Sequence, residues 1–359
     1  MKKNLVLLVI LLGAIQIVSA QEKNSPLTIS GYAETYYQYD FSNPLHNKRP
    51  GFVYSHDRNN EINLNLGFIK AAYNTEMVRA SLAIAAGTYM NANYSSEPGV
   101  LKNIYEANIG IKLSKTHNVW LDAGIMPSHI GSESAISKDC WTLTRSIGAE
   151  NSPYFETGAK LSYSTTNEIW TVSLLMLNGW QRIQKADGSS VPSFGHQLIY
   201  KPNKRFTINS SSYIGNDKTD RNRQMRYFHN LYAICQIHNQ WGVTAGFDIG
   251  LEQKSKGSSK YNSWYSPVLI VRFKHSDKLA FAARGEYYSD KNGVIIATDT
   301  PNGFQSFGYS LNADYHILPN LVWRAEIKNL ESKDAIFLDR DNNMTKNNLS
   351  AIISIAVNI

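Results

Sequence analysis

The sequence predicts an all-β protein: a transmembrane, antiparallel up-and-down β-barrel of about sixteen strands, with about fourteen strands as the alternative. Three observations predict it. Segments of about ten residues alternate apolar and polar positions along much of the chain, as expected when alternate side chains face lipid and lumen. The connections between these segments alternate between short and long. Charged residues make up only 18% of the chain, whereas it holds 21 Tyr, a residue typical of membrane interfaces.

The first twenty residues predict a cleaved export signal. Lys2 and Lys3 form a basic start, residues 5–18 are apolar, and Val18-Ser19-Ala20 has residues that suit signal peptidase. The apolar run is short for a membrane-spanning helix, which is the alternative. No later stretch reaches the length of about eighteen apolar residues that such a helix needs.

The alternation is clearest in the second half of the chain. Residues 241–252 place Trp, Val, Ala, Phe, Ile and Leu on one face and mostly Gly, Thr, Asp and Glu on the other. The last twelve residues, 348–359, alternate in the same way, and a helix would instead need a period of 3.6. We expect strands, in chain order, at 27–41, 60–73, 77–89, 103–113, 119–126, 154–163, 169–179, 194–200, 206–215, 226–237, 241–253, 264–274, 279–289, 304–316, 321–331 and 348–359.

The connections between these strands predict the two rims. They are long at 42–59, 90–102 and 127–153, and short at 74–76 and 114–118. The same alternation continues to a last long loop at 332–347. Short turns on one rim and long loops on the other are typical of outer-membrane barrels, with periplasmic turns and external loops. An even number of strands then places both chain ends on the turn side.

Composition limits the other classes. No linker or change of composition divides residues 21–359, so we expect one domain. The formal charge of +7 falls to +5 without Lys2 and Lys3, and no basic block or zinc spacing accompanies it, so we expect no nucleic-acid partner. Cys140 and Cys235 fall on a predicted loop and a predicted strand, and a disulfide between them is not required. A soluble sandwich would need a second sheet to cover the apolar face.

Several segments resemble the OmpL-like putative β-barrel porins of Gram-negative bacteria. The first strand, ISGYAETYYQYDF at 29–41, resembles the opening of that family, and DRNNEINLN at 57–65 resembles its second strand. Further similarity runs through LDAGIMPSHIGSE at 121–133, WTLTRS at 141–146, AENSPY at 149–154 and LNGWQ at 177–181. The resemblance covers residues 29–181 and implies an outer-membrane channel without naming its solute. Many outer-membrane barrels end in an aromatic residue, whereas this chain ends in Asn358-Ile359.

Strand parity places charged side chains of both signs toward the lumen. Facing rows of opposite charge would produce a transverse field that admits small dipolar solutes. The alternative is that these residues simply pair with neighbours across strands. The candidates for the pore lining are Glu34, Glu61, Arg79, Glu106, Asp122, Glu156, Lys160, Arg272, Arg284, Glu286, Arg324 and Glu326.

The loop at 127–153 is the candidate for a pore constriction. It is among the longest connections, and loops of such length are usually functional or disordered. We expect it to fold into the barrel and narrow the pore; the alternative is an external surface loop. Its candidate residues are His129, Glu133, Asp139, Trp141, Arg145 and Glu150.

Catalysis and metal binding are weakly supported. Ser128 and His129 are adjacent, so on a strand they would point to opposite faces, and no third group orients them. Cys140 with His129 is equally weak as a nucleophile pair. His129, Glu133 and Asp139 have metal-ligand chemistry but no recognised spacing. We therefore expect no enzyme activity, no metal and no cofactor.

The sequence as a whole predicts an outer-membrane porin for passive or weakly selective diffusion of small hydrophilic solutes. The expected partners are outer-membrane lipid and lipopolysaccharide, the barrel-assembly machinery and the solutes, with a homotrimer or a monomer as the working form. Two alternatives stay open: a barrel-anchored adhesion protein with functional loops, and a channel specific for sugars or peptides.

Overall fold

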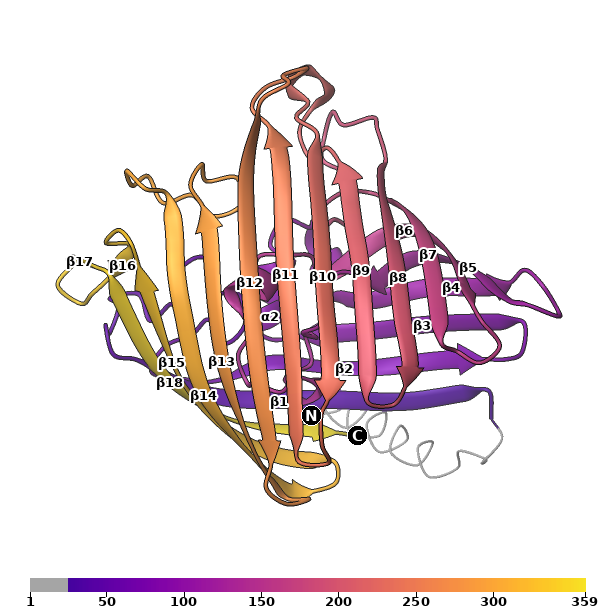
Figure 1. Cartoon of the computed structure of the whole chain (residues 1–359), viewed down its shortest axis with the longest axis horizontal. Helices are drawn as coiled ribbons and strands as arrows, with labels where there is room; N and C mark the ends of the chain where they lie inside the picture. Colours follow the sequence, from indigo (N-terminus) through magenta and orange to yellow (C-terminus); the bar gives the residue numbers. More distant parts are fainter. Residues whose placement is uncertain (1–24) are drawn as a thin grey trace, which may run out of the picture.

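The protein is a closed antiparallel β-barrel of sixteen strands in the computed structural model, which describes residues 25–359 (Figure 1). The predicted export signal at 1–20 lies outside the described residues. The predicted strand number is thus confirmed. The barrel strands are β1 Leu27–Asp40, β2 Ile62–Asn74, β3 Val78–Ala86, β4 Ile104–Lys112, β5 Asn118–Pro127, β6 Phe155–Ser164, β7 Trp170–Leu177, β8 Ser193–Asn203, β9 Phe206–Gly215, β10 Arg226–Gln236, β11 Trp241–Gln253, β12 Tyr261–Lys274, β13 Leu279–Asp290, β14 Phe304–Leu318, β15 Leu321–Ser332 and β18 Asn347–Asn358.

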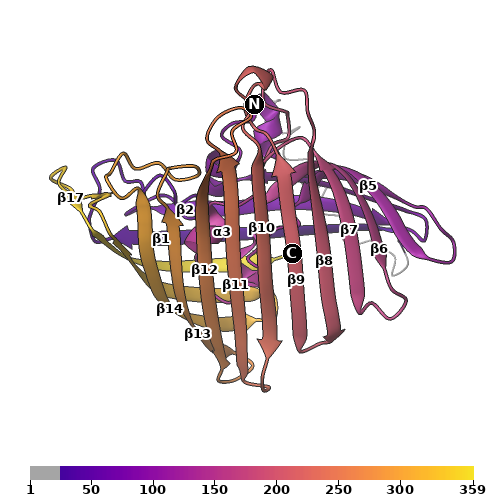
Figure 2. The same cartoon turned by 45° about the horizontal axis from the view of Figure 1, so that its top comes forward.

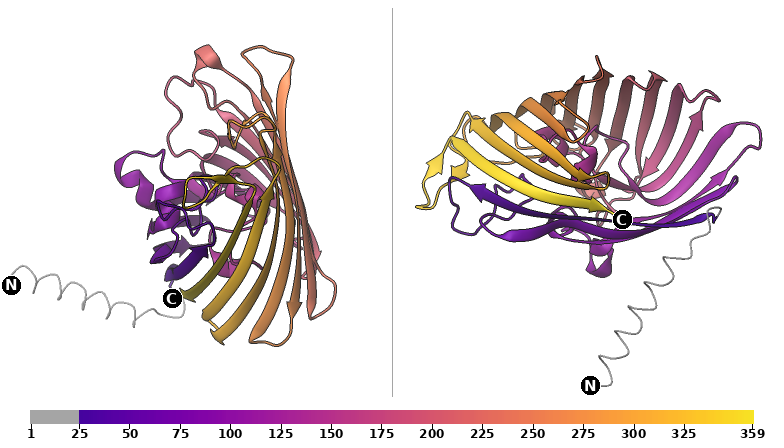
Figure 3. Two further views of the ribbon diagram at one scale, coloured as in Figure 1. Left: turned by 90° about the vertical axis from the view of Figure 1, so that its left-hand side faces the viewer. Right: turned by 90° about the horizontal axis from the view of Figure 1, so that it is seen from below.

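The barrel closes where the first strand meets the last. Each strand pairs with its neighbours in the chain, and β1 pairs with both β2 and β18. Gly31 and Ile359 complete this seam by exchanging two backbone hydrogen bonds of 2.8 Å. The non-aromatic end of the chain is therefore fully paired, and the indigo and yellow strands lie side by side in Figure 3.

The two rims differ as expected. Seven turns of two to five residues join the strands at one rim, and loops of seven to 27 residues join them at the other. The longest loop, residues 128–154, links β5 to β6. In Figure 2 the long connections rise above the upper ends of β8–β12, whereas short turns close the lower ends.

Most strand boundaries lie within three residues of the prediction, and one hairpin was not predicted. The strand predicted at 77–89 ends at Ala86 because the helix α2, Thr88–Asn93, begins just after Gly87, whose φ is +131°. The turn predicted at 201–205 is shorter, because β8 continues to Asn203 past an irregularity in its pairing with β9. The last loop contains a hairpin of two short strands, β16 Phe337–Leu338 and β17 Met344–Thr345, that alternation did not reveal.

The outer face of the barrel is apolar and carries aromatic side chains over most of its circumference. Tyr227 and Tyr261 pack near the loop rim, and Trp241 and Phe273 pack near the turn rim. The strands β3, β4 and β5 form an exception. The two aromatic residues they contain lie on the inner face: Tyr105 stacks on Phe68, and Trp120 lies under Arg79. The outer face of this sector therefore consists of Ala, Val, Leu and Ile, flanked by Pro127 at its loop rim.

The remaining helices are short and lie in the loops. They are η1 Gly99–Asn103, η2 Ser137–Asp139, α3 Ile147–Glu150 and η3 Asp220–Asn222. Within residues 25–359, none of the helices has the length and apolar run of a bilayer-spanning helix. Both η2 and α3 belong to residues 128–154, which we name the lumenal segment because it contacts the inner wall of the barrel.

Candidate functional site

The lumenal segment begins at the inner wall of β6, β8 and β9. The His129 ring lies between the Glu156 carboxylate, 2.7 Å from Nδ1, and the Ser212 carbonyl, 2.8 Å from Nε2. The carbonyl of His129 accepts hydrogen bonds from Gln197 Nε2 and Ser211 Oγ at 2.9 and 2.7 Å. Burial alone would lower the pKa of His129, but the adjacent Glu156 raises it above 6.5.

The segment then crosses to the opposite wall. Ser137 Oγ donates to Glu34 Oε1 on β1 at 2.5 Å, and Arg324 on β15 donates to the carbonyls of Ser137 and Cys140. Arg324 also pairs with Asp314 on β14 at 2.7 Å. The bonds of Ser137 and Cys140 join the middle of the segment to β1 and β15, so the chain spans the lumen. In Figure 3, seen from below, its ribbon lies between the two walls.

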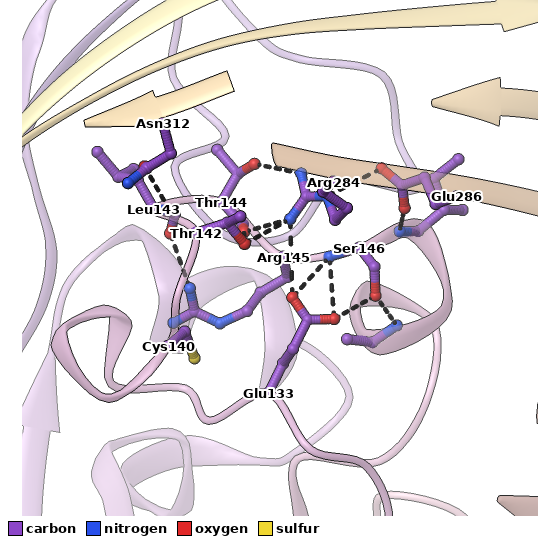
Figure 4. A network of polar contacts seen from close by, with 12 residues as sticks. Glu133, Cys140, Thr142, Leu143, Thr144, Arg145, Ser146, Arg284, Glu286 and Asn312 are labelled. Carbon is purple, nitrogen blue, oxygen red and sulfur yellow. Dashed lines mark hydrogen bonds and ion pairs between the residues drawn. The ribbon is translucent and has the colours of Figure 1, made fainter. Parts of the chain in front are cut away.

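Arg284 on β13 is the hub of the contact with this wall (Figure 4). Its guanidinium donates to Thr142 Oγ1 at 2.9 Å and to Glu326 Oε1 at 3.0 Å, and lies 3.7 Å from Glu133. Thr144 N donates to the same Glu326 at 2.6 Å. All of these charged side chains are buried, and removing one partner of a buried ion pair typically costs about 3–5 kcal/mol. The network therefore holds the segment firmly.

Arg145 stabilises the bend of the segment from within. Its guanidinium is fully buried and donates to the carbonyls of Ala135 and Leu143 at 2.8 Å, and also to that of Ser134. Lys328 on β15 donates to the Arg145 carbonyl at 3.0 Å. The Arg145 side chain thus gives hydrogen-bond partners to backbone carbonyls that no helix or strand satisfies and that would otherwise be buried without partners.

The end of the segment connects to the first external loop. Ser146 caps α3 by accepting from Ala149 N, and Ile147 N donates to Glu286 on β13. Glu150 accepts hydrogen bonds from the backbone of Tyr54 and Ser55 at 2.9 and 3.0 Å. Burial raises the pKa of Glu150 above its usual range.

Apolar contacts complete the packing of the segment. Ile130 and Ile147 lie in a buried cluster with Phe228 and Trp264, and Ala135 lies in another with Tyr32. Burying one such aliphatic side chain contributes about 1.5–3 kcal/mol.

Two cavities lie on the loop side of the segment. The larger one, about 620 Å³, lies among external loops and is lined by Arg49, Phe52 and Ile296, among others. The smaller one, about 290 Å³, is lined by Glu150, Trp180 and Arg182 among others. Tyr54, Asn151 and Ile295 line both, so the two cavities adjoin above the segment.

The sector of β2–β6 carries a second set of charges. Arg79 pairs with Asp122 at 2.6 Å, and Lys70 pairs with Glu106 at 2.7 Å. Lys160 on β6 lies directly opposite Asp122 in the register but forms no ion pair with any described residue.

The predicted residues therefore separate into groups. Those buried against the lumenal segment are Glu34, Glu156, Arg284, Glu286, Arg324 and Glu326, together with His129, Glu133, Arg145 and Glu150 of the segment itself. Arg79, Glu106, Asp122, Lys160 and Arg272 lie on the inner wall away from these bonds. Glu61 precedes β2 at the loop rim and pairs with Arg58 at 2.8 Å. Asp139 is exposed, and Trp141 lies close to Gly242 on β11.

The residues considered for catalysis or metal binding from the sequence do not come together as a site. Both ring nitrogens of His129 are engaged by Glu156 and Ser212, so neither faces Ser128 or Cys140. Cys140 is a buried free thiol whose pKa is raised by burial, and Cys235 is also free. Within the described part of the chain, no group of three or more His, Cys, Asp or Glu side chains has the arrangement of a metal site.

Three contributors to the network were not singled out from the sequence. Strand parity places Lys328 and Asp314 on the same inner face as the predicted candidates, although neither was included among them. His56, which lies 3.2 Å from Glu34, belongs to an irregular loop, where no periodicity exists to signal its position.

Comparison with known proteins adds a family and a set of similar folds. The model of the family described as "Putative beta-barrel porin-2, OmpL-like" matches residues 26–359. No curated protein matches the chain. The anion-selective porin from Comamonas acidovorans is similar in fold, with a TM-score of 0.60, 8% identity and coverage of 93% of this chain and 99% of that one. The outer-membrane channel DcaP of Acinetobacter baumannii has a TM-score of 0.60 and 8% identity, and the match covers 93% of this chain and 97% of that one. The trimer form of OmpT from Vibrio cholerae has a TM-score of 0.57 and 8% identity, with coverage of 93% of this chain and 99% of that one.

Proposed function

The chain belongs to the OmpL-like putative beta-barrel porin-2 family and is an outer-membrane porin, and we propose that small hydrophilic solutes cross it by diffusion past the lumenal segment. The single observation that carries this proposal is the contrast between the two faces of one closed barrel. The outer face is apolar, whereas the inner face bears the charged side chains and the segment that they bind. A barrel of this size is wide enough to leave an aqueous path.

We propose that residues 21–359 act as one barrel domain in which the lumenal segment sets the narrowest part of the pore. Its hydrogen bonds to β1, β9 and β13–β15 support this role, because they hold it across the lumen at several points. The ion pairs of Glu133 with Arg284 and of His129 with Glu156 hold its two halves against the barrel wall. In such pores, the width of the narrowest part and the charged side chains that line the lumen both influence which solutes pass.

The route has two parts in this proposal. Solutes enter from the outside through the adjoining cavities above Asn151, where Tyr54 and Glu150 form part of the floor. After the segment they meet the inner wall of the turn side, which carries Arg79, Lys160 and Arg272.

Lipid, the assembly machinery and further copies of the chain are the proposed partners. Lipopolysaccharide and lipid surround the apolar outer face, and the barrel-assembly machinery inserts the strands. A homotrimer is proposed as the working form, since one similar porin is described as a trimer form and the sector β3–β5 has no outward aromatic residue. Aromatic belts mark lipid–water interfaces, so a sector without them is suited to contact with another copy.

Planar lipid bilayers test the proposed function. We expect the purified protein to insert as open channels with ohmic conductance that rises with salt concentration. Block by one class of solute would instead favour a specific channel. A folded, inserted barrel that carries no current would contradict the proposal and favour a protein whose barrel is only an anchor.

A further inference from the structure

The turn-side half of the inner wall carries more positive charge than its carboxylates neutralise. We propose that the pore therefore prefers small anions, and that Lys112, Lys160 and Arg272 set this preference. The inference rests on the proposed porin function and names the solute class that the pore admits best.

The wall of β3–β6 shows why Lys160 is not neutralised. In the register, Arg79, Gly110, Asp122 and Lys160 form one row across four adjacent strands. Arg79 reaches over Gly110 and binds both oxygens of Asp122, at 2.6 Å each. A Cβ at position 110 would overlap Asp122 Oδ1, so the pair in this geometry uses the space left by Gly110. The carboxylate opposite Lys160 in the register is thereby already occupied.

Arg79 is further fixed by an aromatic ring. Its guanidinium carbon lies 4.3 Å from the centre of the Trp120 ring, which adds a cation–π contact to the two hydrogen bonds. Lys112 lies opposite Trp120 in the register, and its side chain forms no ion pair with any described residue. Lys112 therefore lies next to the Arg79–Asp122 pair on the inner face, as a half-buried lysine without a carboxylate partner.

On the opposite wall, Arg272 is also left without a carboxylate partner. Arg272 on β12 lies on the same face as the buried Ile270, so it points inward. Its carboxylate neighbour, Asp314, is bound through both oxygens by Arg324, at 2.7 and 3.0 Å. Arg272 has no ion pair among residues 25–359, and its Nε is buried without a hydrogen-bond partner.

The lumenal segment does not supply carboxylates that neutralise these positive charges. It contributes Lys138 and Asp139 to this side, and neither forms an ion pair within the described chain. Asp314, Arg272, Lys138 and Arg324 all lie within electrostatic reach of His316 on β14, and Asp314 is the one of these that Arg324 already binds. The pairs Lys70–Glu106, Arg79–Asp122 and Arg324–Asp314 neutralise one another, whereas Lys112, Lys138, Lys160 and Arg272 have no carboxylate bound among residues 25–359.

Unbalanced charge on both walls of a water-filled lumen acts on every ion that passes. The low-dielectric barrel wall concentrates the field in the lumen, which raises the local concentration of anions and lowers that of cations. The charges are screened over about 10 Å at 0.1 M salt, so the preference should weaken as the salt concentration rises. Side chains from β4, β6 and β12 lie on two opposite walls, so the positive charge acts from both sides of the lumen.

Reversal potentials across a KCl gradient test the inference. We expect the native channel to be chloride-selective at 0.1 M KCl and less so at 1 M KCl. In the triple variant Lys112→Gln, Lys160→Gln, Arg272→Gln, we expect the ratio of chloride to potassium permeability to fall about threefold or more. The single variant Arg272→Gln gives a smaller change in the same direction and serves if the triple variant fails to fold.

The matched control removes the same charge outside the lumen. Lys115, Lys204 and Lys278 are exposed residues of the short turns, and the control variant changes all three to Gln. We expect its permeability ratio to equal that of the native channel. A native channel that conducts without anion preference would overturn the inference and leave the porin function intact, as would an unchanged ratio in the charge-removal variants. A folded barrel without any conductance would overturn both.

Discussion

The inward charged residues of this barrel either bind the lumenal segment or remain without an ion pair, and the two groups differ in burial. Arg284 and Arg324 are almost completely buried and bind the lumenal segment, so their charge is used within the protein. Lys160 and Arg272 are only half-buried and form no ion pair with described residues, so their charge acts on the water-filled space. Residue type alone does not separate the two groups.

His129 gives a pH dependence at the residue scale. Although burial alone would lower its pKa, Glu156 raises it above 6.5, so the ion pair stabilises the fold fully below about pH 6. This contribution is lost as the pH rises through the raised pKa. We expect the thermal midpoint of the detergent-solubilised barrel to fall between pH 6 and pH 9, as measured by circular dichroism.

The variant His129→Gln provides the comparison for this prediction. It removes one partner of a buried pair and should destabilise the barrel by about 3 kcal/mol at pH 6. The part of the pH dependence that comes from the pair should then disappear. An identical pH profile in the variant would show that His129 does not carry a proton in the folded barrel.

At the scale of elements, the lumenal segment is held by other strands rather than by its own secondary structure. Its helices η2 and α3 have only three and four residues. Its stability therefore depends on bonds to the barrel wall, such as those of Thr144 to Glu326 and of Lys328 to Arg145. The barrel strands depend on it much less, because their backbone hydrogen bonds are made to each other.

Deleting residues 130–147 tests the element directly. We expect the barrel to fold, because all sixteen strands keep their partners, and its single-channel conductance to rise about twofold or more as the lumen widens. Deleting 255–259 from the external loop between β11 and β12 is the control and should leave the conductance unchanged. An unchanged conductance in a folded 130–147 deletion would remove the segment from the pore.

At the scale of the whole molecule, the barrel is closed and its outer face lies against the membrane. Closure through β1 and β18 leaves no barrel strand edge unpaired, which the bilayer interior requires. Aromatic side chains surround most of the barrel, but the outer face of β3–β5 has none. We expect this sector to contact another copy of the chain.

Cross-linking in native membranes checks this expectation. In a Cys235→Ser background, Leu82→Cys on β3 should give a dimer band with a short bis-maleimide, because Leu82 lies in the aromatic-free sector. Phe247→Cys on β11 is the matched control: both side chains are exposed on the outer face, and the control should stay uncross-linked. Equal cross-linking at both positions, or none at either, would contradict an interface at β3–β5.

The sequence by itself determined the barrel, because its signals are local. A strand places successive side chains on opposite faces, so Arg284, Glu286 and Glu326 could be assigned to the inner face from alternation alone. Turn and loop lengths are also read directly along the chain, and they predicted the two rims. The ends of strands were less certain, as at Ala86, where a glycine with positive φ and a helix follow.

Only the tertiary structure decided which inward charges bind each other and which stay free. Arg324 and Cys140 are 184 residues apart in the sequence, and Thr144 and Glu326 are 182 apart. No periodicity connects such positions, because they meet only after sixteen strands close into a ring and the irregular lumenal segment crosses it. The physical reason is range: alternation follows from the geometry of one residue and the next, whereas ion pairing depends on where distant backbones come to lie.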